Sequence, residues 1–254
     1  MRLVILLLIA CSLSACVTES DGVLFSRDVD KPKAIKSHVD AASQYLREGD
    51  ATGALRHLRK AQVLDPNSQQ VHAALAVSFE LTQDFDLAEK HHKKAIRIKG
   101  ESQTSAINNY SVFLYKQGRF DEAKKQLEKV VNDALYARRG AAFSTLGLCE
   151  LKLDNGTAAA KAFKRALALD RQNGTALIEL AVLALNANNA ALAQRYYDKY
   201  SLGNRVTPRS LLLGIQIAEQ TGKNQQTIDN AKTLKTLYPQ SAEYARYLRQ
   251  YKRD

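Results

Sequence analysis

Histidine and cysteine are the side chains of this sequence that could bind a metal or attack a substrate, and both are scarce. The 254 residues contain five histidines and three cysteines. His91 and His92 are adjacent, so on a helix they point about 100° apart and cannot hold the same metal ion. His38 and His72 lie 34 residues apart, a spacing that favours a packing role. The sequence also lacks a phosphate-binding loop, a His-Glu-x-x-His motif and a cysteine pair at metal-ligand spacing. It predicts no metal site and no cofactor.

Acidic residues and the last cysteine give no sign of catalysis. Asp84, Asp86, Asp121 and Glu122 fall in predicted turns and on solvated faces. Cys149 lies in an apolar stretch, where burial as a small hydrophobic side chain is the expected role. We therefore predict a protein that is not an enzyme and takes no small-molecule substrate. An enzymatic alternative would require a polar residue whose loss removes activity without removing partner binding.

The N-terminal residues have the order of a secretory signal peptide. Arg2 is followed by a compact apolar run over residues 3–10 and then by small residues. This run is too short for a membrane-spanning helix, which needs about 20 residues. Residues 13–16, Leu-Ser-Ala-Cys, resemble the bacterial lipobox, in which the cysteine receives a diacylglycerol and becomes the new N-terminus. The alternative is an ordinary signal peptide with an incidental cysteine at Cys16.

The lipobox resemblance implies how the N-terminal region is divided and where it goes. Residues 1–15 are expected to be a signal peptide and residues 16–34 a lipidated tether, with acyl chains on Cys16 inserted in lipid. In enterobacterial lipoproteins an Asp after the cysteine favours the inner membrane, so Val17 favours the periplasmic side of the outer membrane. The net charge of +11 comes from Lys and Arg spread over many helices. That distribution predicts solvated faces rather than nucleic-acid binding.

Beyond the tether the sequence repeats itself. A small residue recurs at separations of 34, 35, 36 and 34 residues, which matches the period of about 34 of tetratricopeptide (TPR) repeats. The recurring residues are Ala54, Ala88, Ala123, Ala159 and Ala193. Alanine lets two antiparallel helices approach closely, and each pair must then bury its apolar face on the next pair.

This period predicts the fold class. We expect an all-α protein over residues 35–254, a right-handed α–α superhelix of about six TPR repeats. The sixth repeat begins near Ser210, with its second helix shifted by one residue. A last helix from Ser241 to about Lys252 is expected to cap the solenoid. No proline interrupts a predicted helix, since Pro32 falls in the tether, Pro208 between repeats, and the other two after second helices.

The first helices of TPR repeats line a concave surface, which is the candidate binding site. Apolar residues form its floor and polar residues its edges, as suits a bound peptide or helix. The predicted groove consists of Val39, Ser43, Leu46, Arg47, Ala73, Val77, Leu81, Asn108, Val112 and Tyr115. Some of these residues could instead pack on the neighbouring repeat. The Lys-x-x-x-Asn start of carboxylate-clamp TPR domains is absent, because Val39 and Ser43 occupy those places.

Four blocks carry a more specific resemblance. Residues 108–123 read NNYSVFLYKQGRFDEA, and residues 72–77, 210–214 and 234–239 read HAALAV, SLLLG and LKTLYP. Together they resemble the PilF/PilW family of type IV pilus biogenesis lipoproteins. The resemblance implies a pilotin, which binds the outer-membrane secretin of the pilus and promotes its localisation and multimerisation. The alternative is a TPR lipoprotein that serves as a scaffold for peptidoglycan enzymes or for the outer-membrane barrel-assembly machinery.

The lipobox prediction can be tested directly by substitution. Cys16→Ala removes the sulfur that would be acylated, so the protein should become soluble or be sorted to the wrong membrane. Membrane fractionation of cells that express each form measures this. A variant that still fractionates with the outer membrane would show that lipidation does not localise the protein.

Overall fold

A computed structural model describes residues 30–251 with the exception of residue 101. Thirteen α-helices and no strands form the described part of the chain. The helices are α2 (Lys31–Arg47), α3 (Ala51–Leu64), α4 (Gln69–Leu81), α5 (Phe85–Arg97), α6 (Gln103–Lys116), α7 (Phe120–Asn132), α8 (Arg139–Lys152), α9 (Gly156–Leu169), α10 (Gly174–Asn186), α11 (Ala190–Gly203), α12 (Pro208–Gln220), α13 (Asn224–Leu237) and α14 (Ala242–Tyr251). The predicted signal peptide, Cys16 and most of the tether lie outside the described residues. Between residues 30 and 251, no helix combines the length and apolarity needed to cross a membrane.

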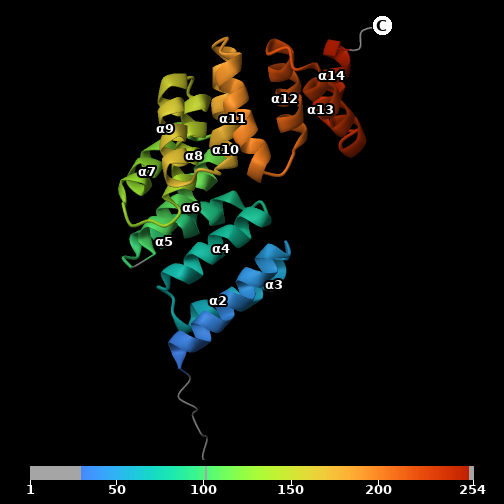
Figure 1. The fold of residues 1–254 in the computed structure, drawn as a ribbon. Coiled ribbons are helices and arrows are strands. Elements are labelled where there is room, and N and C mark those ends of the chain that lie inside the picture. Colours follow the sequence, from blue (N-terminus) through green and yellow to red (C-terminus); the bar gives the residue numbers. More distant parts are fainter. Residues whose placement is uncertain (1–29, 101, 252–254) are drawn as a thin grey trace, which may run out of the picture.

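Helices α2 to α13 form six consecutive hairpins, and α14 follows the last one (Figure 1). Each hairpin packs on the next, and α14 packs on α12 and α13. The predicted all-α solenoid of six repeats with a C-terminal capping helix is therefore confirmed.

The recurring alanine has the same structural place in five repeats. It is the fourth residue of α3, α5, α7, α9 and α11, and all five copies are fully buried. In α13 the fourth residue is Thr227, 34 residues after Ala193. The predicted one-residue shift of the sixth repeat is therefore wrong, because a threonine has replaced the alanine without changing the register.

The turns inside the six hairpins share one backbone conformation. Each turn contains a single residue with positive φ, which reverses the chain after the first helix. These residues are Gly49, Gln83, Gly118, Asp154, Asn188 and Gly222, with φ between 56° and 79°. The second helices then begin, in three repeats, with an Asp or Asn whose side chain accepts a backbone N–H, namely Asp50, Asp84 and Asn189.

The start of the first helix differs from the sequence-based boundary. Helix α2 begins at Lys31, so residues 31–34 are helical rather than part of the tether. Asp30 caps it by accepting the backbone N–H of Lys33 at 3.1 Å. Pro32 lies in the first turn, where a fixed φ fits and no donor is lost, and Pro208 opens α12 in the same way.

Contacts between repeats curve the solenoid. The first helices touch in sequence, α2 with α4, α4 with α6, and so on to α12 with α14. The second helices of neighbouring repeats make no such contact within the described residues. The first helices must therefore lie on the inner, concave side, and the second helices fan out on the convex side.

The fit of Gly147 against Phe163 generates a stability prediction. Phe163 is fully buried, and a Cβ at Gly147 would lie 2.6 Å from its ring. Gly147→Ala should therefore lower the free energy of unfolding by about 1–3 kcal/mol through overpacking. The matched control is Gly156→Ala, where the nearest atom is a Leu183 methyl at 3.9 Å. Chemical denaturation measures both, and equal stability of the two variants would contradict the prediction.

Candidate functional site

A cavity of about 290 Å³ opens on the concave side between α2, α4 and α6. Five of the ten predicted groove residues line it together: Val39, Ser43, Leu46, Ala73 and Val77. Its other walls come from Gln69, Gln70, Ala74, Ser102, Ser105, Ala106 and Asn109. The first helices of three repeats thus contribute to one hollow.

The other five predicted residues lie outside this cavity. Arg47 and Leu81 are exposed at the last positions of α2 and α4, and Val112 and Tyr115 are half-buried on α6. Tyr115 packs on Phe120, with ring centroids 5.5 Å apart. Asn108 is only 7% exposed, and its neighbour Asn109 lines the cavity instead. These two neighbours face different directions, because a helix turns by about 100° at each residue.

The polar groups around the cavity are partly committed to the fold. The Ser43 hydroxyl donates to the carbonyl of Val39 at 2.8 Å. The Gln69 amide donates to the carbonyls of Ala95 and Ile98 at 3.0 and 2.8 Å, which ties α4 to the end of α5. Val39, Leu46 and Val77 therefore supply an apolar floor, while the amides of Gln70 and Asn109 remain at its rim. Such a surface suits an apolar side chain of a bound polypeptide.

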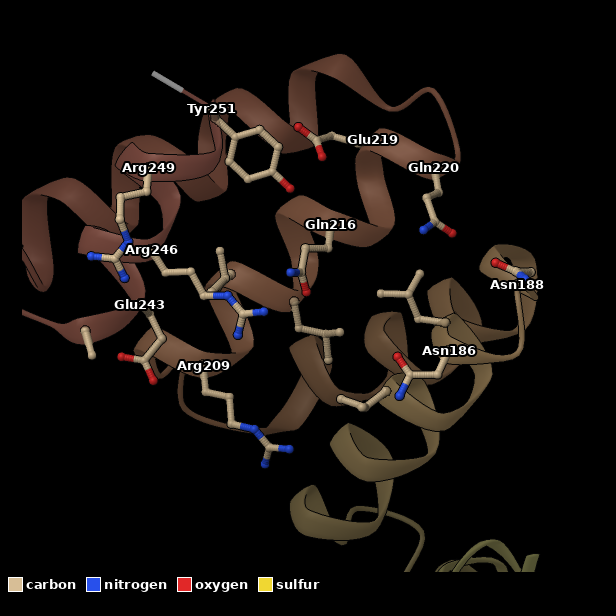
Figure 2. A pocket seen from close by; sticks show the side chains of 15 residues that line it. Asn186, Asn188, Arg209, Gln216, Glu219, Gln220, Glu243, Arg246, Arg249 and Tyr251 are labelled. Atoms are coloured by element: carbon tan, nitrogen blue, oxygen red, sulfur yellow. The ribbon is translucent and has the colours of Figure 1, made fainter. Parts of the chain in front are cut away.

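A second and larger hollow, of about 860 Å³, lies where α10, α12 and α14 meet. Figure 2 shows arginine, glutamine, asparagine and glutamate side chains around it. Arg209 is held by Glu179, which is 5% exposed and receives both guanidinium nitrogens at 2.6 and 2.9 Å. Burial and the neighbouring Glu219 raise the pKa of Tyr251 to about 12, so its hydroxyl stays protonated.

The sequence analysis did not find this hollow. Arg246 and Arg249, three residues apart on the capping helix, were a usable signal because that spacing places both side chains on one helix face. Their partners in the lining, such as Gln216 and Asn186, come from α12 and α10 and could not be assigned from spacing alone.

Several charged groups in the early repeats serve packing between repeats. Burial disfavours ionised Glu80, but hydrogen bonds from His92 and Lys116 outweigh it and hold its pKa below the ordinary value. Glu89 accepts hydrogen bonds from Arg119 at 2.8 Å and from the Tyr110 hydroxyl at 2.7 Å. The Arg119 bond is the main reason that the pKa of Glu89 falls to about 2. These carboxylates therefore stay ionised and link repeats.

The histidines form two equivalent pairs that the sequence analysis missed. The Nδ1 atoms of His38 and His57 are 3.3 Å apart, and those of His72 and His91 are 2.9 Å apart. Each pair is separated by 19 residues, a recurrence that could have revealed them. Among the described residues, no three His, Cys, Asp or Glu side chains converge in a group suited to a metal ion.

Cys149 is fully buried, which confirms its predicted packing role. Burial raises the pKa of its thiol to about 12, so almost no thiolate forms near neutral pH. A nucleophilic role does not fit this environment.

The hairpins and the concave face lined by first helices define a TPR protein. The family model described as "Tetratricopeptide repeat" matches residues 114–174 and 144–205. The chain is 33% identical over 246 residues to the type IV pilus assembly protein PilF of Pseudomonas aeruginosa, covering 97% of each chain. The chain therefore belongs to the PilF family of type IV pilus biogenesis TPR proteins.

Solved structures agree with this assignment. The structure of Pseudomonas aeruginosa PilF matches with a TM-score of 0.81 at 33% identity, over 87% of this chain and 99% of that one. The structure of PilW, described as a widely conserved type IV pilus biogenesis factor, matches with a TM-score of 0.74 at 26% identity. That match covers 85% of this chain and 99% of PilW. The predicted family resemblance is confirmed.

The His72–His91 pair generates a prediction for pH dependence. His72 Nε2 lies 2.9 Å from the carbonyl of Pro66 and donates to it, so its Nδ1 accepts from His91. Burial is the main cause that lowers the pKa of both rings, that of His91 from 6.5 to about 4. The fold thus favours neutral rings. The stability is fully present above about pH 6.5 and should fall as the pH drops toward 4, because the unfolded chain binds protons first.

Thermal unfolding between pH 8 and 4 measures this effect. His91→Phe keeps an aromatic ring against Phe79 and His72 but removes one titrating group. Its melting temperature should change less between pH 6.5 and 4 than that of the unsubstituted protein. Parallel curves for the two proteins would contradict the assignment.

Proposed function

We propose that this protein is an outer-membrane lipoprotein that acts as a pilotin in type IV pilus biogenesis. It binds the secretin of the pilus, directs it to the outer membrane and promotes its multimerisation. The anchor is the acylated Cys16, and the mature chain faces the periplasm. The observation that carries the proposal is the match to a type IV pilus assembly protein over 97% of the chain, together with a concave cavity at the predicted groove.

The proposed mechanism is non-covalent. An apolar side chain of a secretin segment enters the cavity above Val39, Leu46 and Val77, and the rim amides of Gln70 and Asn109 bind its backbone. Anchoring the partner-bound solenoid in lipid raises the local concentration of secretin at the membrane, which favours its assembly. No step needs a cofactor or a nucleophile.

A charged residue in the cavity tests this mechanism. Val77→Asp places a carboxylate on the apolar floor, so a bound segment would have to bury an unpaired charge. We expect at least a tenfold loss of affinity, or about 1.4 kcal/mol, for the secretin. The measurement is recovery of secretin with the tagged protein from detergent-solubilised envelopes.

The matched control is Ile228→Asp, which makes the same kind of change at a position 59% exposed on α13. Unchanged thermal unfolding of both variants shows that the fold is intact. Equal secretin recovery by both variants would place the interaction elsewhere. Recovery of peptidoglycan enzymes or barrel-assembly subunits in place of secretin would support the scaffold alternative.

A further inference from the structure

Positive charge recurs at two positions of the second helices. The sixth and tenth residues of α3, α5, α7, α9 and α11 are lysine or arginine in every case. The sixth residues are Arg56, Lys90, Lys125, Lys161 and Arg195, and the tenth residues are Lys60, Lys94, Lys129, Arg165 and Lys199. These ten cations are here called the basic ladder. In α13 the same two positions hold Asp229 and Thr233, so the ladder ends with the fifth repeat.

The basic ladder faces away from the concave side of the solenoid. The fourth residue of each of these helices is the fully buried alanine. A helix turns by about 100° at each residue, so the sixth and tenth residues lie about 200° and about 240° from that alanine. Nine of the ten cations are accordingly exposed, and Lys94 is half-buried. The ladder therefore follows the convex face from one repeat to the next (Figure 1).

The ladder cations are not neutralised by carboxylates of the described residues. None of the ten forms an ion pair there. Helices α3 and α9 contain no Asp or Glu. Lys94 donates to the carbonyl of Pro66 at 3.0 Å, and Lys129 donates to the side chain of Gln126 at 3.1 Å. Both acceptors are uncharged, so the positive charge of the ladder remains available to an external anion.

Acidic residues on the same helices are few or are bound elsewhere. Glu89 on α5 and Glu122 on α7 each form an ion pair with Arg119. The ninth residue of these helices is acidic in two of them, as Glu128 and Asp198, and basic in the other three. The convex face therefore carries an excess of positive charge along five repeats.

This arrangement costs the isolated protein some stability. Two like charges four residues apart destabilise a helix, and the sixth and tenth residues form such a pair in five helices. A face that meets only water would gain from mixing both signs. A row of one sign instead concentrates anions along itself. A bound anion would remove the repulsion that the fold leaves uncompensated.

The shape of the row limits the kinds of anion that fit it. Figure 1 shows the row on a curved solenoid, with α3 and α11 inclined to one another, so a flat bilayer would contact only part of it. Duplex DNA is too stiff to follow the row, since its persistence length is about 150 base pairs. Single strands need aromatic side chains for stacking, and Phe85 is the one exposed aromatic residue on the five helices. A flexible chain that carries carboxylates at short intervals fits best.

We propose that the basic ladder binds an extended, acidic segment of another polypeptide along the convex face. Asp and Glu side chains of that segment pair with the cations of successive repeats. The ladder lies opposite the concave cavity, so this segment and a segment in the cavity can be bound at the same time. The inference therefore does not depend on the proposed secretin site.

Charge reversal in the full-length protein tests this inference. The ladder variant combines Lys125→Glu, Lys161→Glu and Arg195→Glu, at three exposed positions of the ladder. The matched control combines Arg138→Glu, Arg171→Glu and Lys223→Glu, at three exposed positions in loops. Both variants have the same net charge, so a difference between them reports position. Thermal unfolding checks that both are folded.

Fluorescence anisotropy measures binding of labelled oligoglutamates of about 10 and about 40 residues, which span at most about 35 and about 140 Å. The longer chain reaches several repeats, so it should bind the unsubstituted protein at least tenfold more tightly than the shorter one. The ladder variant should lose at least tenfold in affinity for the longer chain, and the control about threefold at most. Binding should weaken as the salt concentration rises.

Equal losses in the two variants would overturn the proposal, because binding would then follow net charge alone. Equal affinities of the two oligoglutamates would also overturn it, since no chain would run along several repeats. Phosphatidylglycerol vesicles and a DNA duplex are the competing probes. If either binds through the ladder more tightly than the longer oligoglutamate does, the partner is a membrane or a nucleic acid and the proposal is wrong.

Discussion

Close approach of two helices at a small side chain is the constraint on which the rest of the structure depends. The fourth residue of five second helices is a fully buried alanine. Only a small residue fits there, since the sixth repeat keeps its hairpin with Thr227 at this place and a bulky side chain would push the two helices apart. Gly147 shows how narrow the tolerance is, because Phe163 fills the space that a Cβ would need. Each hairpin is narrow for this reason, and narrow hairpins can stack into a solenoid.

Stacking then determines where a partner can bind. First helices touch one another and second helices do not, so the inner surface is built from residues that repeat at intervals of about 34. One end of this surface carries the apolar cavity around Val77, and the other carries the arginine-lined hollow beside the capping helix. A long polypeptide could therefore meet different chemistry along one concave face. The buried thiol of Cys149 and the ionised carboxylates of Glu80 and Glu89 stabilise this surface without reacting.

Much of this architecture could be predicted from sequence because the repeating pattern of residues determines where the helices and the concave surface lie. The alanine period located five of the six hairpins, and the clustering of Val39, Ser43, Leu46, Ala73 and Val77 followed from repeat position. Errors arose where local geometry departs from the repeat. Asn109 rather than its predicted neighbour Asn108 lines the cavity, and Pro32 was placed in the tether although it lies in the first turn of α2. The hollow beside α14 needs contacts between helices that no period encodes.

The backbone conformation of the hairpin turns limits the free energy of unfolding of the chain. Three turns use glycine at the positive φ, whereas Gln83, Asp154 and Asn188 adopt it with side chains that pay a steric cost there. The strained turns belong to the second, fourth and fifth repeats, and only the fourth and fifth pack on each other. Because repeats interact only with their neighbours, relief of strain at Gln83 would add almost independently of relief at the other two turns. The free energy of unfolding is therefore lower than the same backbone would allow. The difference is divided among these turns along the solenoid.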